Sequence, residues 1–313
     1  MHGLLLLCLA GVLASAHGLS SLGAKESLLS IFGVAQAPES SADPVLAEPG
    51  TLAPLRSGVR VYGTPTVGAI TRDFMVGSEG KYPSYVAGYT DLVPPSPSRA
   101  PWELSRDVRV MESLFQLPTT SFLYERGWRQ AFTSNGFPGI DKEFEDLVKF
   151  CPSSGATIDL SCGSGLMTRR LVKSGRFGRV IGADLSSSML MESARRFGQE
   201  GLPKPELIRC DVRSMPIQSG SINLCHAGAA LHCWVQLEDS LKEVYRILAP
   251  GGQFYATTFL TSALISGVPT NQSTGFHFFT LAELEAEMHA AGFDTVEVTQ
   301  SGRACAIVKC TKS

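Results

Sequence analysis

The feature of this sequence that most constrains the fold is an alternation of strand and helix patterns that begins after Cys151. Runs of β-prone residues and runs with helical periodicity follow each other to the end of the chain, which predicts parallel strands joined by crossover helices. We therefore expect an α/β fold with a doubly wound, mostly parallel sheet of seven strands. The expected strands are residues 156–160, 179–184, 205–210, 222–226, 253–259, 295–299 and 304–308.

The helices between these strands are expected from their periodicity and from their boundaries. Helical patterns cover residues 166–173 and 237–248, and another helix ends near Arg196. Thr280 followed by Glu283 has the spacing of a capping box, which predicts a helix that Gly292 closes.

The first residues have the pattern of a cleavable leader. An apolar run at residues 4–14 is followed by Ala14-Ser15-Ala16, a small-x-small sequence typical of signal peptide cleavage sites. The run is shorter than the ~20 residues that a membrane-spanning helix needs, so no transmembrane span is expected. The alternative interpretation of this run is a buried N-terminal helix.

Composition divides residues 17–150, which precede the expected α/β domain, into segments. Residues 17–54 are rich in Ser, Ala, Gly and Pro and lack periodicity, which is typical of a linker or a transit segment. The expected organisation is a signal-like leader at 1–16, a flexible transit-like or linker segment at 17–54, a small β-rich segment without metal ligands at 55–100, a helical lid at 101–150 and the α/β domain at 151–313.

Cysteine usage indicates a reducing compartment. Removal of Cys8 with the leader leaves seven cysteines, all between Cys151 and Cys310, and no Cys-x-x-Cys pair occurs. A two-part plastid leader would combine these features, because it directs a chain through the secretory route into a reducing compartment. We therefore predict a plastid (chloroplast) location. The secretory pathway is the alternative, because residues 17–54 hold four acids against one lysine, whereas transit peptides are poor in acids.

The charge of the chain argues against nucleic acid as a partner. It contains 27 Lys and Arg against 29 Asp and Glu, a formal net charge of -2. Such a balance creates no overall field that would hold a polyanion.

A glycine-rich turn at residues 161–165 follows the first expected strand and opens a helix. Its glycines allow a ligand to approach the backbone, and the free N–H groups of the helix attract polar groups. A dinucleotide fingerprint would place a third glycine at Thr168, and the carboxylate of Asp159 would repel a pyrophosphate but suits an ammonium. Simple tight packing of the turn is the alternative.

Three aspartates end three successive strands. Asp159, Asp184 and Asp211 could contact an ammonium, a ribose diol and an exocyclic amine in that order along the carboxyl edge of the sheet. Each one alone could instead cap the following helix.

Residues 158–165, together with these acids, resemble the first motif of the class I S-adenosylmethionine-dependent methyltransferases. The resemblance implies a Rossmann-like methyltransferase fold with S-adenosylmethionine as cofactor. It implies that Asp159, Gly163 and Gly165 hold the methionine part, Asp184 the ribose and Asp211 the adenine, with Leu185 and Val212 as apolar walls. Ser161 stands where many members have a glycine, and a serine fits there with a negative backbone φ.

Other segments narrow the resemblance. Residues 209–217, 219–224 and 246–252 resemble the ubiquinone and menaquinone C-methyltransferases. Residues 121–130, 136–139 and 226–234 resemble an uncharacterised plastid methyltransferase group of plants and algae. Members of that group often carry a cysteine-rich ribbon. Here residues 58–93 are similar to it only at 82–93 and hold no thiolates, so no metal site is expected in this segment.

Candidate catalytic and acceptor residues lie outside the glycine-rich turn. Methyl transfer needs mainly alignment, but a phenol or enol-like acceptor would gain from a base with a pKa near 7, and His226 and His232 are the candidates. A purely structural role is the alternative for both histidines. The candidates for the wall of an apolar acceptor pocket, or for ordinary core, are Tyr124, Trp128, Phe132 and Phe278.

The sequence thus predicts a methyltransferase that transfers a methyl group from S-adenosylmethionine to a small apolar acceptor such as a quinone or a lipid-like phenol. The partner is this small molecule, and the sequence does not indicate an oligomeric state. Two alternatives remain open: a nucleotide-dependent oxidoreductase on the same sheet, and a binding subunit that keeps the fold without turnover.

Overall fold

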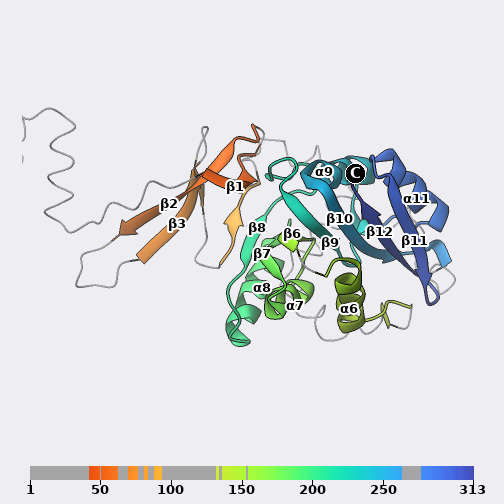
Figure 1. The fold of residues 1–313 in the computed structure, drawn as a ribbon. Helices are drawn as coiled ribbons and strands as arrows, with labels where there is room; N and C mark the ends of the chain where they lie inside the picture. Colours follow the sequence, from red (N-terminus) through yellow and green to blue (C-terminus); the bar gives the residue numbers. More distant parts are fainter. Residues whose placement is uncertain are drawn as a thin grey trace, which may run out of the picture. The chain divides into compact units, whose positions relative to one another are not determined.

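The structure is a computed structural model that describes residues 42–49, 51–62, 70–76, 81–83, 88–93, 132–133, 136–152, 154–262 and 276–313. Its main element is an eight-stranded sheet with the order β11-β12-β10-β9-β6-β7-β8-β5 (Figure 1). The strands are β5 (Thr90–Asp91), β6 (Ser154–Leu160), β7 (Phe177–Asp184), β8 (Glu206–Arg209), β9 (Ile222–Ala227), β10 (Leu248–Phe259), β11 (Thr295–Ser301) and β12 (Cys305–Thr311).

The pairing makes this sheet mostly parallel. Strands β5 to β10 run parallel to one another, whereas β12 is antiparallel to both β10 and β11. The seven expected strands are all present, and the two-residue strand β5 adds an eighth at the edge. The predicted doubly wound, mostly parallel sheet is confirmed.

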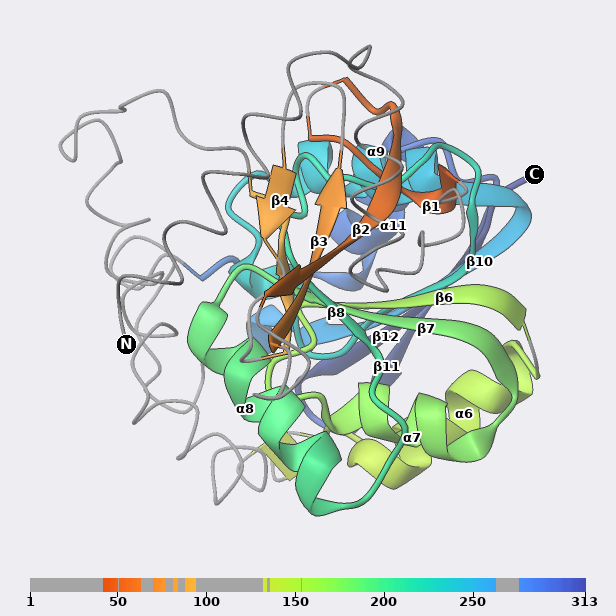
Figure 2. The same ribbon diagram turned by 90° about the vertical axis from the view of Figure 1, so that its left-hand side faces the viewer.

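Helices cover both faces of the sheet. They are α6 (Ile140–Phe150), α7 (Leu166–Ser174), α8 (Ser187–Gln199), α9 (Leu237–Ile247) and α11 (Leu281–Ala290), with a short 3₁₀ helix, η3 (Leu231–Cys233). Figure 2 shows α6, α7 and α8 on one face and α9 and α11 on the other. The expected capping box of α11 is present, since Thr280 Oγ1 accepts from the Glu283 N–H and Glu283 accepts from the Thr280 N–H.

Strand β10 illustrates why the sheet is buried on both faces. Phe254 packs in the cluster under α9 and α11, and its neighbour Tyr255 packs with Leu147 of α6 and Leu171 of α7 on the opposite face. Successive side chains of a strand point to opposite faces, so an unbroken apolar run is needed where helices cover both.

Strand β10 also begins earlier than expected. The breaker sequence at residues 249–252 lies inside the strand, and the pairing with β9 shifts between Leu248 and Gln253. This irregularity accommodates Pro250 and Gly251, which are both exposed.

The described N-terminal residues form a second sheet of four antiparallel strands, β1 (Ala42–Ala47), β2 (Pro54–Tyr62), β3 (Ile70–Val76) and β4 (Lys81–Pro83). Strands β2 to β4 fall almost wholly in the segment expected to be β-rich, 55–100, and β1 lies in the segment expected to be flexible, 17–54. The reason is local burial: Leu46 bridges Ile217, and the Ala47 N–H donates to the Pro216 carbonyl.

Parts of the expected organisation fall outside the described residues. These include the leader at 1–16, most of the segment at 17–54, and most of the helical lid, of which α6 and residues 132–133 and 136–139 are described. Within the described ranges, no helix has both the length and the hydrophobicity required to span a membrane.

Candidate active site

The glycine-rich turn joins β6 to α7 at the carboxyl edge of the sheet. Gly163 and Gly165 have positive φ angles of 55° and 79°, which glycine adopts without strain. A Cβ on Gly165 would lie 2.3 Å from Ser193 Oγ of α8, so the close approach of α8 also requires glycine here.

Ser161 departs from its expected conformation. Its φ is +50°, not negative, and it is one of three non-glycine residues with positive φ in the described part of the chain. For an L-residue this conformation costs about 1–2 kcal/mol. The Trp234 Nε1–H donates to Ser161 Oγ at 3.0 Å, a bond that a glycine could not accept and that ties the turn to the segment after β9.

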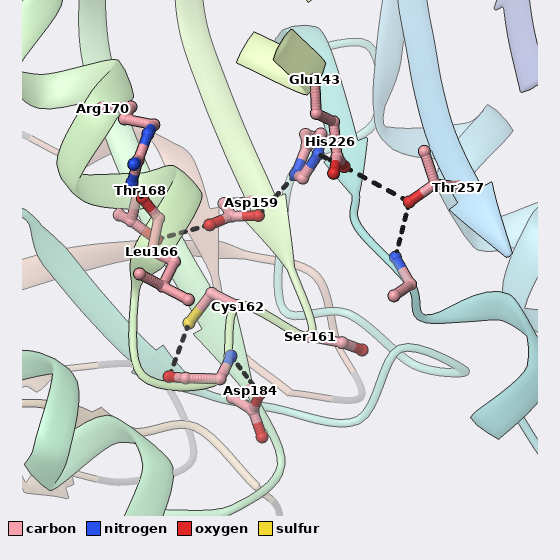
Figure 3. Close-up of polar contacts among 12 residues, drawn as sticks. Glu143, Asp159, Ser161, Cys162, Leu166, Thr168, Arg170, Asp184, His226 and Thr257 are labelled. Atoms are coloured by element: carbon pink, nitrogen blue, oxygen red, sulfur yellow. Dashed lines mark hydrogen bonds and ion pairs between the residues drawn. The ribbon is translucent and has the colours of Figure 1, made fainter. Parts of the chain in front are cut away.

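Asp184 lies half-buried at the end of β7, as the sequence predicted. Its Oδ2 accepts the Gly163 N–H at 2.8 Å (Figure 3), and its Oδ1 accepts the Ser186 N–H at 2.8 Å. Burial raises the pKa of Asp184, and these backbone bonds only partly offset it. Because a carboxylate offers about four acceptor positions and the Leu185 N–H also bonds this one, capacity remains for a hydroxyl of a ligand.

Asp211 follows β8 and is held by its neighbour. The backbone N–H and Nε of Arg213 donate to Oδ1, and Nη2 donates to Oδ2 at 2.5 Å. Burial would raise the pKa of Asp211, but the Arg213 guanidinium more than offsets it and lowers the pKa. Val212 and Leu185 are half-buried beside the two acids.

Asp159 does not present its carboxylate to a ligand. The side chain is 2% exposed, Oδ2 accepts the Thr168 hydroxyl at 2.5 Å, and Oδ1 is bound by His226 Nδ1 at 2.7 Å (Figure 3). The expected contact between Asp159 and an ammonium group is therefore corrected. Asp159 instead supports the glycine-rich turn through its bonds to Thr168 and His226.

His226 lies between two acids. Its Nδ1 contacts Asp159, and its Nε2 lies 3.1 Å from Glu143 Oε1 of α6. Burial by itself lowers the pKa of His226, but the hydrogen bonds and charges of Asp159 and Glu143 reverse that effect and raise it to about 9. The side chain is a buried imidazolium near neutral pH, and the expected base with a pKa near 7 is not found here.

His232 has the opposite environment. Burial lowers its pKa to about 3, since no acid compensates for the loss of water. Its Nδ1 is 3.4 Å from Thr258 Oγ1, and its ring packs against aromatic side chains. His232 is thus a neutral imidazole, again without a pKa near 7.

These side chains form an aromatic cluster around His232, made of Phe132, Phe137, Phe259, Phe276 and Phe278. The ring centroids of Phe137 and Phe259 are 4.6 Å apart, and the ring of Phe278 stacks over His232 at 6.3 Å. Phe132 and Phe278, two of the expected acceptor residues, are therefore brought together. Tyr124 and Trp128, the other two, lie outside the described residues.

Three further residues of the site were not predicted from the sequence: Glu143, Thr257 and Phe259. Glu143 precedes the fully buried Leu147 by four residues, so both belong to the buried face of α6. An acid on the apolar face of an amphipathic helix was the available signal. Thr257 and Phe259 carry no signal beyond their place in β10.

Metal ligation has no support in the described ranges. They contain no group of three or more His, Cys, Asp or Glu side chains placed to hold a metal ion. Their seven cysteines are free thiols, and six of them are buried.

Comparison with known proteins decides between the ligand classes that this edge of the sheet could serve. A family model described as "Methyltransferase domain" matches residues 158–256, which include the glycine-rich turn and all three aspartates. The chain contains a methyltransferase domain. This match confirms the predicted resemblance to S-adenosylmethionine-dependent methyltransferases.

Relatives of this methyltransferase domain occur in plants and bacteria. An uncharacterized chloroplastic methyltransferase of Arabidopsis thaliana is 42% identical over 171 residues, 53% of this chain and 48% of that protein. A 2-phytyl-1,4-naphtoquinone methyltransferase of Thermosynechococcus vestitus is 31% identical over 103 residues, 33% of this chain and 45% of that protein. The chain spans about half the length of the curated relatives it matches.

Solved structures share the fold of the methyltransferase domain. A methyltransferase from Aquifex aeolicus described as S-adenosylmethionine-dependent has a TM-score of 0.52 at 16% identity and covers 63% of this chain and 99% of that one. A phosphoethanolamine N-methyltransferase of Haemonchus contortus, solved with S-adenosylhomocysteine, has a TM-score of 0.54 at 14% identity, with 95% and 75% covered. At these identities the likeness concerns the fold alone.

Proposed function

We propose that this protein transfers a methyl group from S-adenosylmethionine to a small, uncharged, apolar acceptor. The observation that carries the proposal is the glycine-rich turn with Asp184 bound to its Gly163 N–H, within the residues that match the methyltransferase domain. The cofactor would supply an activated methyl group on a sulfonium, so the protein's main task is alignment.

The residues at this edge of the sheet fit the cofactor. Gly163 carries no Cβ, so the methionine part could approach the backbone of the glycine-rich turn, while Asp184 has acceptor capacity for a ribose hydroxyl. Asp211, oriented by Arg213, would accept the adenine amine, with Val212 as an apolar wall. The role of Asp159 becomes indirect, since its oxygens bind Thr168 and His226.

The aromatic cluster supports an apolar acceptor. It surrounds His232 at the carboxyl end of β10, and the described residues place no acid in contact with that histidine. An ammonium acceptor would lack a counterion there, whereas a quinone or phenol ring can pack against the aromatic faces. Relatives named as naphtoquinone and demethylmenaquinone methyltransferases point to the same acceptor class.

His232 would orient the acceptor rather than remove its proton. A neutral imidazole can exchange a hydrogen bond with a ring oxygen, but with a pKa of about 3 it is a weak base near neutral pH. A quinol or phenol acceptor would then lose its proton to water.

The proposed location is the plastid. Two Arabidopsis relatives, 42% and 41% identical, are named as chloroplastic, and the composition of residues 1–54 supports a two-part leader. A fluorescent protein fused behind residues 1–54 is expected in the plastid of an algal host. Fluorescence retained in the secretory lumen would contradict this proposal.

Calorimetric titration with S-adenosylmethionine and S-adenosylhomocysteine tests the cofactor. Micromolar binding of both is expected, and Asp184→Asn should weaken it about tenfold to 150-fold because a charge-assisted hydrogen-bond pair is lost. The matched control is Asp294→Asn, which removes an exposed acid bonded to Ser313.

Two results would contradict the proposal. A folded protein that binds neither compound would withdraw it, and binding of a reduced nicotinamide dinucleotide instead would favour the oxidoreductase alternative. Equal affinities of wild type and Asp184→Asn would overturn the ribose assignment.

A further inference from the structure

We propose that His226 is a positioning residue that ties the glycine-rich turn to α6 and to the loop after β9. It touches neither cofactor nor acceptor, and it acts through Asp159 on one side and Glu143 on the other. The inference rests on the proposed function only for the identity of the bound ligand.

On the side of Asp159, the contacts fix the start of α7. Asp159 Oδ1 is held by His226, which orients Oδ2 toward the Thr168 hydroxyl at 2.5 Å in the first turn of that helix (Figure 3). The glycine-rich turn, residues 161–165, lies between Asp159 and Thr168 in the sequence. Its conformation includes the positive φ of Ser161, so it needs firm anchors at both ends.

On the side of Glu143, the contacts reach the loop after β9. The Thr257 hydroxyl donates to Glu143 Oε1 at 3.3 Å and accepts the Ala229 N–H at 2.8 Å. The loop also packs directly on the pair, because a Cβ on Gly228 would lie 2.8 Å from His226 Cε1 and 2.9 Å from Glu143 Oε1.

The same loop leads back to the glycine-rich turn and to the aromatic cluster. Trp234 bonds Ser161, and His232 lies within the cluster. The bonds from Thr168 through Asp159, His226, Glu143 and Thr257 to Ala229 therefore form one continuous buried path between the two halves of the site.

The path requires the protonated ring. Only an imidazolium can donate to both acids at once, because a neutral ring has a single N–H. The two carboxylates hold the pKa of His226 at about 9 despite burial. The titratable and charged groups around it are Asp159 on β6, Glu143 on α6, Tyr255 on β10 with its partner Asp146, and Cys305 of β12 beside Glu143.

Two amide substitutions separate the two sides of the path. In His226→Asn the side-chain nitrogen replaces Nδ1 and keeps a donor for Asp159, and in His226→Gln it replaces Nε2 and keeps a donor for Glu143. We measure S-adenosylhomocysteine affinity of the full chain by calorimetry from pH 7 to 10, and hydrogen exchange of residues 161–165 without ligand. His289→Asn is the matched control, since the ring of His289 on α11 bonds the Phe293 carbonyl that follows this helix.

The expected results differ for the two amides. His226→Gln should lose at least tenfold in affinity and exchange faster at the glycine-rich turn, whereas His226→Asn should lose less than threefold at pH 7. Wild-type affinity should fall less than threefold as the pH rises through 9, because a neutral ring can still donate to Asp159, and His226→Asn should show no such step. Equal losses in both amides, or no loss in either, would overturn the proposal.

The readouts keep the two proposals distinguishable. If the wild type does not bind S-adenosylhomocysteine, the proposed function fails, but hydrogen exchange of the free protein still decides the role of His226. If both amide variants unfold, Glu143→Gln provides the test. The loss of one carboxylate lowers the pKa of His226, so the pH at which hydrogen exchange of residues 161–165 becomes faster should move below 9. An unmoved step would overturn the proposal.

Discussion

The two buried histidines in the described part of the chain, His226 and His232, lie six residues apart and have opposite charge states. His226 is held as a cation by Asp159 and Glu143, and burial among aromatic rings keeps His232 neutral. Burial alone disfavours the charged form in both. The difference teaches that the acids supplied by other elements, and not depth in the protein, decide what a histidine can do.

The largest test of this comparison is removal of each ring. His226→Leu leaves two buried carboxylates without their cation and should reduce the free energy of unfolding by about 3–5 kcal/mol. His232→Leu removes a neutral ring whose long polar contact, to Thr258, is worth about 1 kcal/mol or less in hydrogen bonding. Urea unfolding at pH 7 measures both, and similar losses in the two variants would refute the assigned charge states.

The pH dependence of stability gives a smaller effect with opposite signs. The pKa of His226 in the folded protein, about 9, lies above the ordinary 6.5, so its contribution is full below pH 6.5 and is lost as the pH rises through 9. The size of this contribution is about 3 kcal/mol. The folded pKa of His232, about 3, lies below the ordinary value, so its contribution is full above pH 6.5 and is lost as the pH falls toward 3.

Unfolding curves at pH 5, 7 and 9.5 separate two arms of the stability profile: an alkaline arm, the loss of stability above pH 7, and an acidic arm, the loss below pH 7. His226→Asn should flatten the alkaline arm and leave the acidic one, and His232→Phe should do the reverse. An alkaline arm that persists in His226→Asn would assign the loss of stability to another group.

The smallest expected effect is that of His232→Phe at pH 7. Phenylalanine keeps an aromatic ring in the aromatic cluster, so the free energy of unfolding should change by less than about 1.5 kcal/mol. Affinity for S-adenosylhomocysteine should stay within twofold, while turnover of a quinone-type acceptor should fall because the ring oxygen loses its partner. Unchanged turnover would remove His232 from the acceptor site.

The fold was largely predictable because its signals are local. The β-prone run of β7, the capping box of Thr280 and Glu283, and the closing Gly292 are read within a few residues. Strand β1 escaped prediction because its burial depends on Ile217 and Pro216, some 170 residues away in the chain. The early start of β10 escaped because pairing with β9 overrode the breaker residues.

The candidate site divides in the same way. Asp184 and Asp211 lie at strand ends as predicted, because a strand end is a local property. The burial of Asp159 and the charges of the two histidines were not predictable, since they depend on Glu143 and on a cluster gathered from distant segments. Ser161, with its positive φ, bonds Trp234, which is equally remote in sequence.

The bond between Glu143 and His226 also constrains how this protein can change over generations. Glu143 belongs to α6, upstream of the residues that match the methyltransferase domain. It nevertheless bonds the buried imidazolium of His226, which lies within them. A lineage that loses either partner first passes through a sequence with an uncompensated buried charge. Positions 143 and 226 are therefore expected to be replaced together in descendants, and the helix and the sheet domain to be inherited as one piece.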